Sequence, residues 1–305
     1  LSAYRSAFNH LVNEAGLATS DAFKKSVKDF FAGLKRQDAE KRQENGDAPT
    51  VGKMALPFGL YRSLAKALLM DGRPQMLFAH CYLVLTWNLM CRSNNTAKIG
   101  IRRIQWREDS LVIYFAQTKS DQAGDRVKDP LHLYANPGMP EICPVLALAM
   151  YLSYFGSGCS SLLFPGSSQA HRFCGLLEAA LVANDDLLEA FGLDSSDLGS
   201  HSIRKGVVTY TLGGSTAAPG IFSVTLRAQW KQGLVQEKYI KYQAAADQFC
   251  GRVAAGLDLL SEKFAVLPPH FAPNNAVVRD AVASVFPHLA QDAPRSFLPV
   301  LEKCL

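Results

Sequence analysis

The pattern of apolar and polar positions in the first part of the chain predicts helices of unequal burial. Residues 2–34 favour two helical segments with a break at 16–20, and residues 57–70 favour a helix that begins with Pro, a residue preferred in first turns. Within residues 76–91, apolar positions recur at i, i+4, i+7 and i+8, and most positions between them are also apolar. Because this run is shorter than the ~20 apolar residues of a membrane span, we predict a helix buried on nearly all sides.

The middle of the chain predicts one small sheet. Residues 111–116 are rich in Val, Ile, Tyr and Phe and favour a strand, and residues 130–135 are a second candidate strand. The polar residues 117–129 between them suit the loop of a hairpin. Nothing in the chain alternates as βαβ units do, and no Gly-rich phosphate loop is present. The predicted fold class is therefore mainly α with a small antiparallel β-sheet (α+β), and energy-dependent nucleotide chemistry is not indicated.

Helices are predicted over most of the remaining chain. They cover 143–155 and 171–191, begin near 200 and near 235, and end in a terminal helix with one apolar stripe formed by Val278, Val282, Val285 and Phe286. The interval between residues 204 and 230 contains Gly and Pro and suggests a long loop. The apolar stripe needs a partner, which is either the protein's own core or a neighbouring subunit.

Composition indicates a folded protein with a large core. Of 305 residues, 48% are hydrophobic and 19% charged. Residues 36–52 change from a charged stretch to a Gly- and Pro-containing loop, which predicts a domain boundary between residues 1–48 and 49–305. The chain begins with Leu1 rather than Met, so we expect a fragment of a longer protein.

The net charge of +5 permits a polyanionic partner without requiring one. Basic residues gather in three groups: Lys24, Lys25, Lys28, Lys35, Arg36, Lys41 and Arg42; Lys98, Arg102, Arg103 and Arg107; and Lys231, Lys238 and Lys241. Solvated helix faces explain such groups as well as a phosphate-contacting surface does. The seven cysteines form no CxxC pair, and no signal peptide is evident, so we expect a reducing compartment and no structural zinc or membrane attachment.

His201 and Arg204 form the first candidate for chemistry. They are three residues apart at the start of a predicted helix, so their side chains share a face. Helix N-termini also offer unpaired N–H groups to anions. The pair can hold a phosphate oxygen through charge-assisted hydrogen bonds. Taken alone, the spacing is unspecific, and two surface residues explain it better. His132, His171 and His270 lack metal-ligand spacing, and we interpret them as structural or surface residues.

Four further residues of suitable chemistry flank this pair. Arg92 follows the predicted buried helix, Lys119 lies where the first predicted strand enters its loop, and Tyr239 comes nine residues after Trp230. Each has an ordinary explanation: Arg can cap a helix, a loop Lys is usually solvated, with Lys128 as a rival, and Trp is usually core. Independent coincidences rarely line up as Arg, Lys, His-x-x-Arg, Trp and Tyr, and the order therefore carries the interpretation.

This ordered set resembles the catalytic set of the tyrosine recombinases, over roughly residues 57–249. The matching residues are Arg92, Lys119, His201, Arg204, Trp230 and Tyr239. The local sequence at 204–206, 226–230 and 238–240 is most similar to that of Crypton-type recombinases of eukaryotic mobile elements. The resemblance implies a catalytic domain at 49–305, with a helical tail from about 265, preceded by a partial helical DNA-binding domain at 1–48.

The resemblance also implies an activity and a role for each residue. The expected enzyme cuts and rejoins double-stranded DNA through a 3′-phosphotyrosine, without cofactor, metal or ATP. Two Arg side chains would clamp the phosphate while His201 and Trp230 donate hydrogen bonds, Lys119 would protonate the leaving 5′ oxygen, and Tyr239 would attack. Tyr242, one helical turn later, remains the alternative nucleophile. The expected DNA-contacting residues are Lys98, Arg102, Arg103, Lys205 and Lys231.

Departures and alternatives accompany this prediction. Many family members carry a carboxylate three residues after the first Arg, where this chain has Asn95. The N-terminal domain is short for a full DNA clamp, so part of it is expected to be missing. A dimer on each DNA site and a tetramer in synapsis are expected, in the nucleus for a eukaryotic mobile element and otherwise in the cytoplasm. A type IB topoisomerase-like enzyme and a catalytically silent DNA-binding module are the alternatives.

Overall fold

The computed structural model describes residues 2–16, 18–46, 52–115, 129–156, 160–230, 241–265, 270–272 and 275–305. It divides into two compact units, Leu1–Gly52 and Lys53–Leu305. The boundary predicted after residue 48 falls outside the described residues.

Helices dominate the described chain, and three short strands accompany them. The helices are α1 (Ser2–Glu14), α2 (Asp21–Glu44), α3 (Phe58–Met70), α4 (Pro74–Asn88), α5 (Ser93–Thr96), α6 (Pro144–Phe155), α7 (Gln169–Val182), α8 (Asp185–Glu189), α9 (Ser200–Gly213), α10 (Ile221–Arg227), α12 (Ala244–Ala254), α13 (Ala276–Val285), α14 (Pro287–Asp292) and α15 (Leu298–Lys303). The strands are β1 (Ile104–Arg107), β2 (Ser110–Ile113) and β3 (Leu131–Leu133). This composition confirms the predicted fold class.

The first unit consists of α1 and α2, as the break at 16–20 predicted. Ser20 caps α2 by accepting a hydrogen bond from the Phe23 N–H. The Phe8 and Phe23 rings join the two helices with centroids 6.3 Å apart, yet α2 has no buried residue. This unit therefore lacks a core of its own within the described residues.

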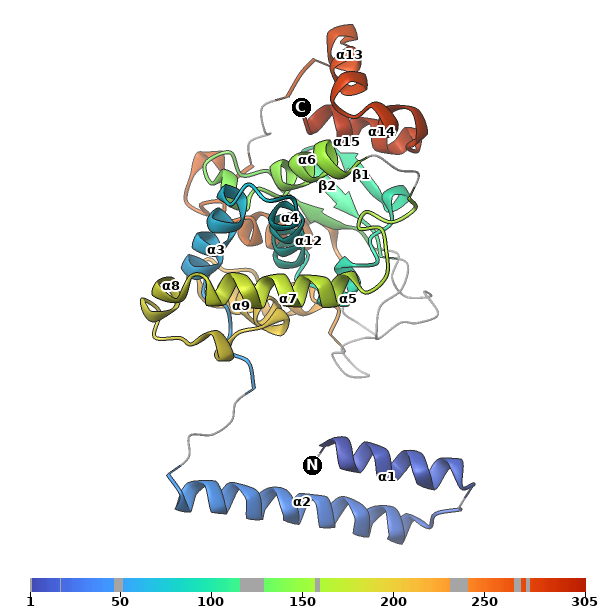
Figure 1. The fold of residues 1–305 in the computed structure, drawn as a ribbon, viewed down its shortest axis with the longest axis vertical. Coiled ribbons are helices and arrows are strands. Elements are labelled where there is room, and N and C mark those ends of the chain that lie inside the picture. Colours follow the sequence, from blue (N-terminus) through green and yellow to red (C-terminus); the bar gives the residue numbers. More distant parts are fainter. Residues whose placement is uncertain are drawn as a thin grey trace. The chain divides into compact units, whose positions relative to one another are not determined.

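The second unit is built around α4, which is buried along nearly its whole length. Helices α3, α6, α7 and α9 contact α4 and enclose it (Figure 1). Its Trp87 ring stacks on Tyr61 of α3 at 4.0 Å, and the Trp87 indole N–H donates to the Ala254 carbonyl of α12. The predicted core helix is confirmed, and none of the described helices is both long and apolar enough to cross a bilayer.

A three-stranded antiparallel sheet in the order β1-β2-β3 packs beside this helical core. Strands β2 and β3 confirm the two predicted strand segments. Strand β1 was not predicted, because only Ile104 of its four residues is buried and its sequence shows no clear alternation. Helix α12 packs on β3, and α15 contacts β1 (Figure 1).

The C-terminal helices fold back onto the second unit. Val282, Phe286, Phe297 and Leu301 belong to its hydrophobic core, so the apolar stripe finds its partner within the chain. Val285 was predicted to lie in that stripe but is exposed on α13.

Three predicted boundaries need correction. Residues 171–191 form two helices, because the Asn184 side chain bonds back to the Ala180 carbonyl and α7 ends there. The helix predicted from near residue 200 is confirmed as α9, but the long loop predicted before residue 230 contains the unpredicted helix α10. The helix predicted from residue 235 is described only as α12, and its predicted start lies outside the described residues.

Candidate active site

Arg92 lies where the buried helix α4 turns into α5. Met90 adopts a positive φ of 49° in this turn, and Arg92 then occupies the N-cap position of α5, half-buried. Its carbonyl accepts the N–H of Asn95, whose side chain is buried. Arg92 therefore follows the core helix as predicted, and a rigid support fixes its backbone.

The N-terminus of α9 is held by an extended segment that precedes α3. Leu56 donates its N–H to the Ser202 carbonyl at 3.0 Å, and Met54 donates to Asp197 at 2.7 Å. A Cβ atom on Gly206 would lie 2.1 Å from the Leu56 carbonyl oxygen, so only glycine permits this approach. The close packing places His201 in the first turn of α9 with an exposed side chain.

Arg204 is the most unusual residue of the predicted set. Its side chain is only 8% exposed, and its Nη2 donates to the Ala228 carbonyl just beyond α10. Burial and, secondly, the nearby charge of Arg92 lower the pKa of its guanidinium to about 10. The Nε atom is buried without a hydrogen-bond partner among the described residues. Arg204 thus remains a cation at neutral pH, in a place where its charge is poorly solvated.

Trp230 closes the same site. The Arg204 guanidinium lies 5.6 Å from the centre of the Trp230 ring, and 43% of this residue is exposed, so it is not a core tryptophan. The positive φ of Gln229, 55°, turns the chain immediately before it. Arg92, His201, Arg204 and Trp230 therefore come from three separate parts of the chain to one neighbourhood around α9.

This arrangement suits an anion. Two guanidinium groups repel each other at short range, and a bound phosphate would relieve both the repulsion and the poor solvation of Arg204. No carboxylate in the described ranges pairs with Arg92, His201 or Arg204. In the same ranges, no group of three or more His, Cys, Asp or Glu side chains is placed to hold a metal ion.

Several predicted residues lie outside the described ranges. They are Lys119 with its rival Lys128, the DNA-contact candidate Lys231, and the predicted nucleophile Tyr239. The alternative nucleophile Tyr242 is described. Its hydroxyl donates to the Pro130 carbonyl at 2.9 Å, and burial, followed by the charge of Asp247, raises its pKa.

The remaining DNA-contact candidates are exposed. Lys98, Arg102 and Arg103 follow α5 and form no ion pair with a described carboxylate. Lys205 extends from α9 to the carbonyl of Lys53, and Lys53 reaches the Ser196 carbonyl beside the start of α9. Lys53 was missed in the sequence because it stands alone in a loop far from residue 200.

Sequence reasoning also missed a buried cluster behind the site. Arg227, 2% exposed, pairs with Asp247, whose carboxylate accepts hydrogen bonds from the His132 backbone N–H and pairs with its ring Nδ1, both at 2.9 Å. Arg227 also donates to the carbonyls of Asn88 and His132, both at 2.8 Å. No local pattern in the sequence predicts this cluster, because Arg227, Asp247 and His132 lie on three different elements and the Asn88 carbonyl belongs to a fourth.

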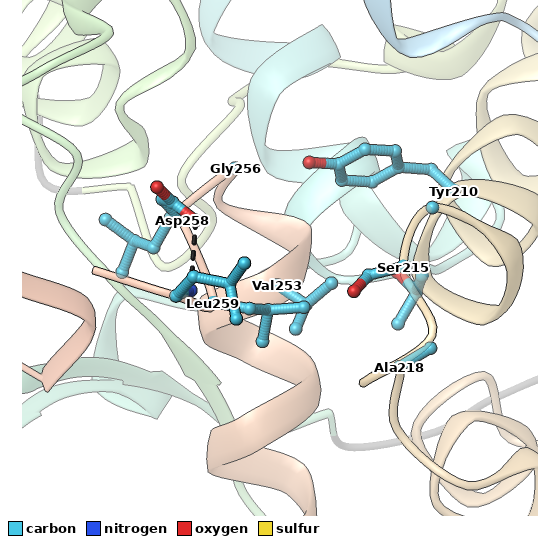
Figure 2. Close-up of a pocket in the computed structure, with 11 residues that line it drawn as sticks. Tyr210, Ser215, Ala218, Val253, Gly256, Asp258 and Leu259 are labelled. Atoms are coloured by element: carbon cyan, nitrogen blue, oxygen red, sulfur yellow. Dashed lines mark hydrogen bonds between the residues drawn. The ribbon is translucent and has the colours of Figure 1, made fainter. Parts of the chain in front are cut away.

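A separate cavity lies at the opposite end of α9. It has a volume of about 340 Å³, and Tyr210, Ser215, Val253 and Asp258 are among the residues that line it (Figure 2). Of the predicted catalytic and DNA-contacting residues that the structure describes, none lines this cavity.

The fold is shared with solved structures of Flp recombinase, a tyrosine recombinase. An FLP recombinase–Holliday junction complex matches 94% of this chain and 72% of its own, with a TM-score of 0.52 and 12% sequence identity. A Flpe–Holliday junction complex covers 91% of this chain and 71% of its own, with a TM-score of 0.53 and 12% identity. The same complex with a tryptophan-to-phenylalanine variant of Flpe covers 90% and 71%, with a TM-score of 0.53 and 13% identity. Neither a protein-family model nor a curated protein sequence matches the chain.

Proposed function

We propose that this protein is a site-specific DNA recombinase or transposase that cuts and rejoins DNA strands through a 3′-phosphotyrosine. The observation that carries the proposal is the buried Arg204 cation, which has no described carboxylate partner and lies beside Arg92 and the exposed Trp230 ring. A recombinase fold supports it, because similar folds are seen bound to Holliday junctions.

The chemistry follows from the charges. Arg92 and Arg204 bind the non-bridging oxygens of the scissile phosphate, and their charge stabilises the pentavalent transition state. His201 and the Trp230 indole N–H add hydrogen bonds to the same oxygens. The tyrosine hydroxyl loses its proton to water as its oxygen forms a bond to phosphorus and the bond to the 5′ oxygen breaks, and Lys119 gives that 5′ oxygen its proton. Rejoining reverses these steps, so the strand is resealed without an external energy source.

Tyr239 is the proposed nucleophile rather than Tyr242. The Tyr242 hydroxyl already donates a hydrogen bond to Pro130, and its raised pKa disfavours the phenolate. A phenol that attacks phosphorus must instead lose its proton readily.

The test is covalent capture. Short nicked duplexes of randomised sequence are mixed with the protein without metal or ATP, and protein–DNA adducts are separated on a denaturing gel and sequenced. The wild type is expected to form an adduct, and Tyr239→Phe is expected to form none while it still binds the same DNA. Tyr242→Phe is the matched control, because it removes the neighbouring hydroxyl and should still form the adduct.

The other outcomes are equally informative. If Tyr242→Phe loses the adduct and Tyr239→Phe keeps it, the nucleophile is Tyr242. If the wild type binds DNA but forms no adduct with any duplex, the protein is a silent DNA-binding module and the proposed enzyme activity is wrong.

The finer assignments belong to the same proposal. The local sequence around residues 204–206 and 226–230 supports a Crypton-type recombinase. A recombinase of that type would act in the nucleus. The exposed basic side chains of α2 support a role for the first unit as part of a DNA-binding domain. A dimer on each DNA site and a tetramer in synapsis complete the proposed assembly.

A further inference from the structure

The buried cluster of Arg227, Asp247 and His132 binds the described ends of several chain segments. Arg227 donates to the Asn88 carbonyl, four residues before Arg92, and Arg227 itself lies three residues before Trp230. The His132 carbonyl accepts a hydrogen bond from Arg227, and the His132 N–H donates to the Asp247 carboxylate. His132 lies in β3, the strand that follows the segment with Lys119. Asp247 follows the segment that carries Tyr239. Each of these segments carries a residue of the proposed catalytic set.

Two further contacts hold the start of β3 in place. The Tyr242 hydroxyl donates to the Pro130 carbonyl at 2.9 Å. A Cβ atom on Gly251 would lie 2.3 Å from the His132 carbonyl oxygen, so α12 approaches the strand as closely as a backbone can. These two contacts therefore hold the chain from Tyr242 through α12 against β3 and the residue that precedes it.

An ion pair so deeply buried is a poor source of stability. Desolvation of two charges offsets most of their attraction, and apolar residues of the same volume often serve stability equally well. An arginine fork offers something that apolar residues lack, since it can donate to oxygens on several elements at once and fix their separation. Arg227 does this with Asp247, Asn88 and His132.

We propose that Arg227 and Asp247 are positioning residues, which hold in register the chain beside Arg92, the chain beside Trp230 and the described residues that follow the segments of Lys119 and Tyr239. This inference rests on the proposed function. Misplacement of reacting groups by about 1 Å can slow a reaction about a hundredfold, so loss of the fork acts on the rate of chemistry rather than on DNA affinity.

The first variant is Arg227→Lys, which keeps the charge and loses the fork. The probe is the nicked duplex that the wild type selects from the randomised pool. The single-turnover rate of adduct formation at saturating protein is expected to fall about a hundredfold. The dissociation constant for the duplex is expected to change less than about threefold, because the phosphate-contacting surface is intact.

Arg252→Lys is the matched control. Arg252 pairs with Asp109 at 2.6 Å from the same helix α12, and this pair joins α12 to the turn between β1 and β2 rather than to the chain beside Arg92 or Trp230. Its adduct rate is expected to stay within about threefold of the wild type. An equal loss in both variants would mean general loosening of the fold and would overturn the inference.

A second variant distinguishes a loss of stability from a loss of positioning. It also serves as the test if Arg227→Lys does not fold. The double variant Arg227→Met/Asp247→Leu removes both charges together and is expected to keep a thermal midpoint near that of the wild type. It should still form adducts about a hundredfold more slowly, since no fork holds the segments. Wild-type adduct rates in either variant would refute the positioning role alone, whereas a wild type without adducts would refute the proposed function and this inference with it.

Discussion

Two buried arginines of the second unit have opposite surroundings. Arg227 is 2% exposed and has a carboxylate, three backbone carbonyls and a histidine-linked network around it. Arg204 is 8% exposed, donates to one carbonyl, and has another cation, Arg92, nearby instead of an anion. The charge of Arg227 is neutralised by Asp247, whereas no carboxylate among the described residues pairs with Arg204.

The contrast separates folding from function. A buried charge that the protein compensates by itself serves the arrangement of the chain, while a buried charge left uncompensated burdens folding. Such a burden is retained where an external charge completes the site, as a scissile phosphate would here. Loss of either arginine is therefore expected to slow the reaction, but only loss of Arg227 is expected to lower the stability of the fold.

Arg204→Met tests the uncompensated member. We expect adduct formation to fall roughly a thousandfold, because one preorganised cation is lost from the transition state. The free energy of unfolding is expected to stay within about 1 kcal/mol of the wild type or to rise, because a poorly solvated charge disappears. Single-turnover adduct assays and denaturant unfolding measure the two effects. A large loss of stability would show that Arg204 is compensated after all, and the contrast would fail.

Arg227→Met tests the compensated member. We expect the free energy of unfolding to fall by about 3–5 kcal/mol, because the substitution leaves the buried Asp247 carboxylate without its main partner. Urea unfolding followed by circular dichroism measures this loss. Arg252→Met, which breaks the less deeply buried pair with Asp109, is the control and should cost less. Equal losses for Arg204→Met and Arg227→Met would remove the distinction between the two residues.

Much of the fold could be predicted from the sequence where burial is one-sided or complete. Helix α4 could be predicted because apolar residues cover all its faces, and β2 because Leu, Val and Ile follow one another in it. Strand β1 and helix α10 did not, since four and seven residues give too little periodicity to recognise. Their structure depends on pairing with β2 and on packing against α9 and α12, which no local pattern encodes.

Some features of the candidate site could likewise be predicted from local sequence, and others could not. His201 and Arg204 share a helix face because of their spacing, and that could be predicted from local geometry. The nearness of Trp230 to Arg204 could be expected only from the order of residues and its resemblance to a family. Arg227 and Asp247 lie 20 residues apart on different helices, so their pairing has no sequence signal. Such long-range polar pairs depend on the assembled core.

The smallest expected effect is on the pH dependence of stability. Acidification should weaken the site of Arg227, through its partner Asp247, but not that of Arg204. Burial raises the pKa of Asp247, but the charge of Arg227 and the hydrogen bonds from His132 outweigh it and hold that pKa below its ordinary value. The stability from this carboxylate is therefore fully present above the ordinary Asp pKa of about 3.9 and is lost as the pH falls through the lower native value.

Urea unfolding between about pH 7 and about pH 3 measures this loss, and Asp247→Asn identifies the share that belongs to this carboxylate. The variant is expected to be less stable near neutrality and to lose less stability on acidification than the wild type. Arg204, with a pKa of about 10, stays charged throughout this range, so its own charge contributes no such dependence. If Asp247→Asn follows the acid dependence of the wild type without a reduced slope, Asp247 is not the group that Arg227 keeps ionised, and the compensated half of the contrast is wrong.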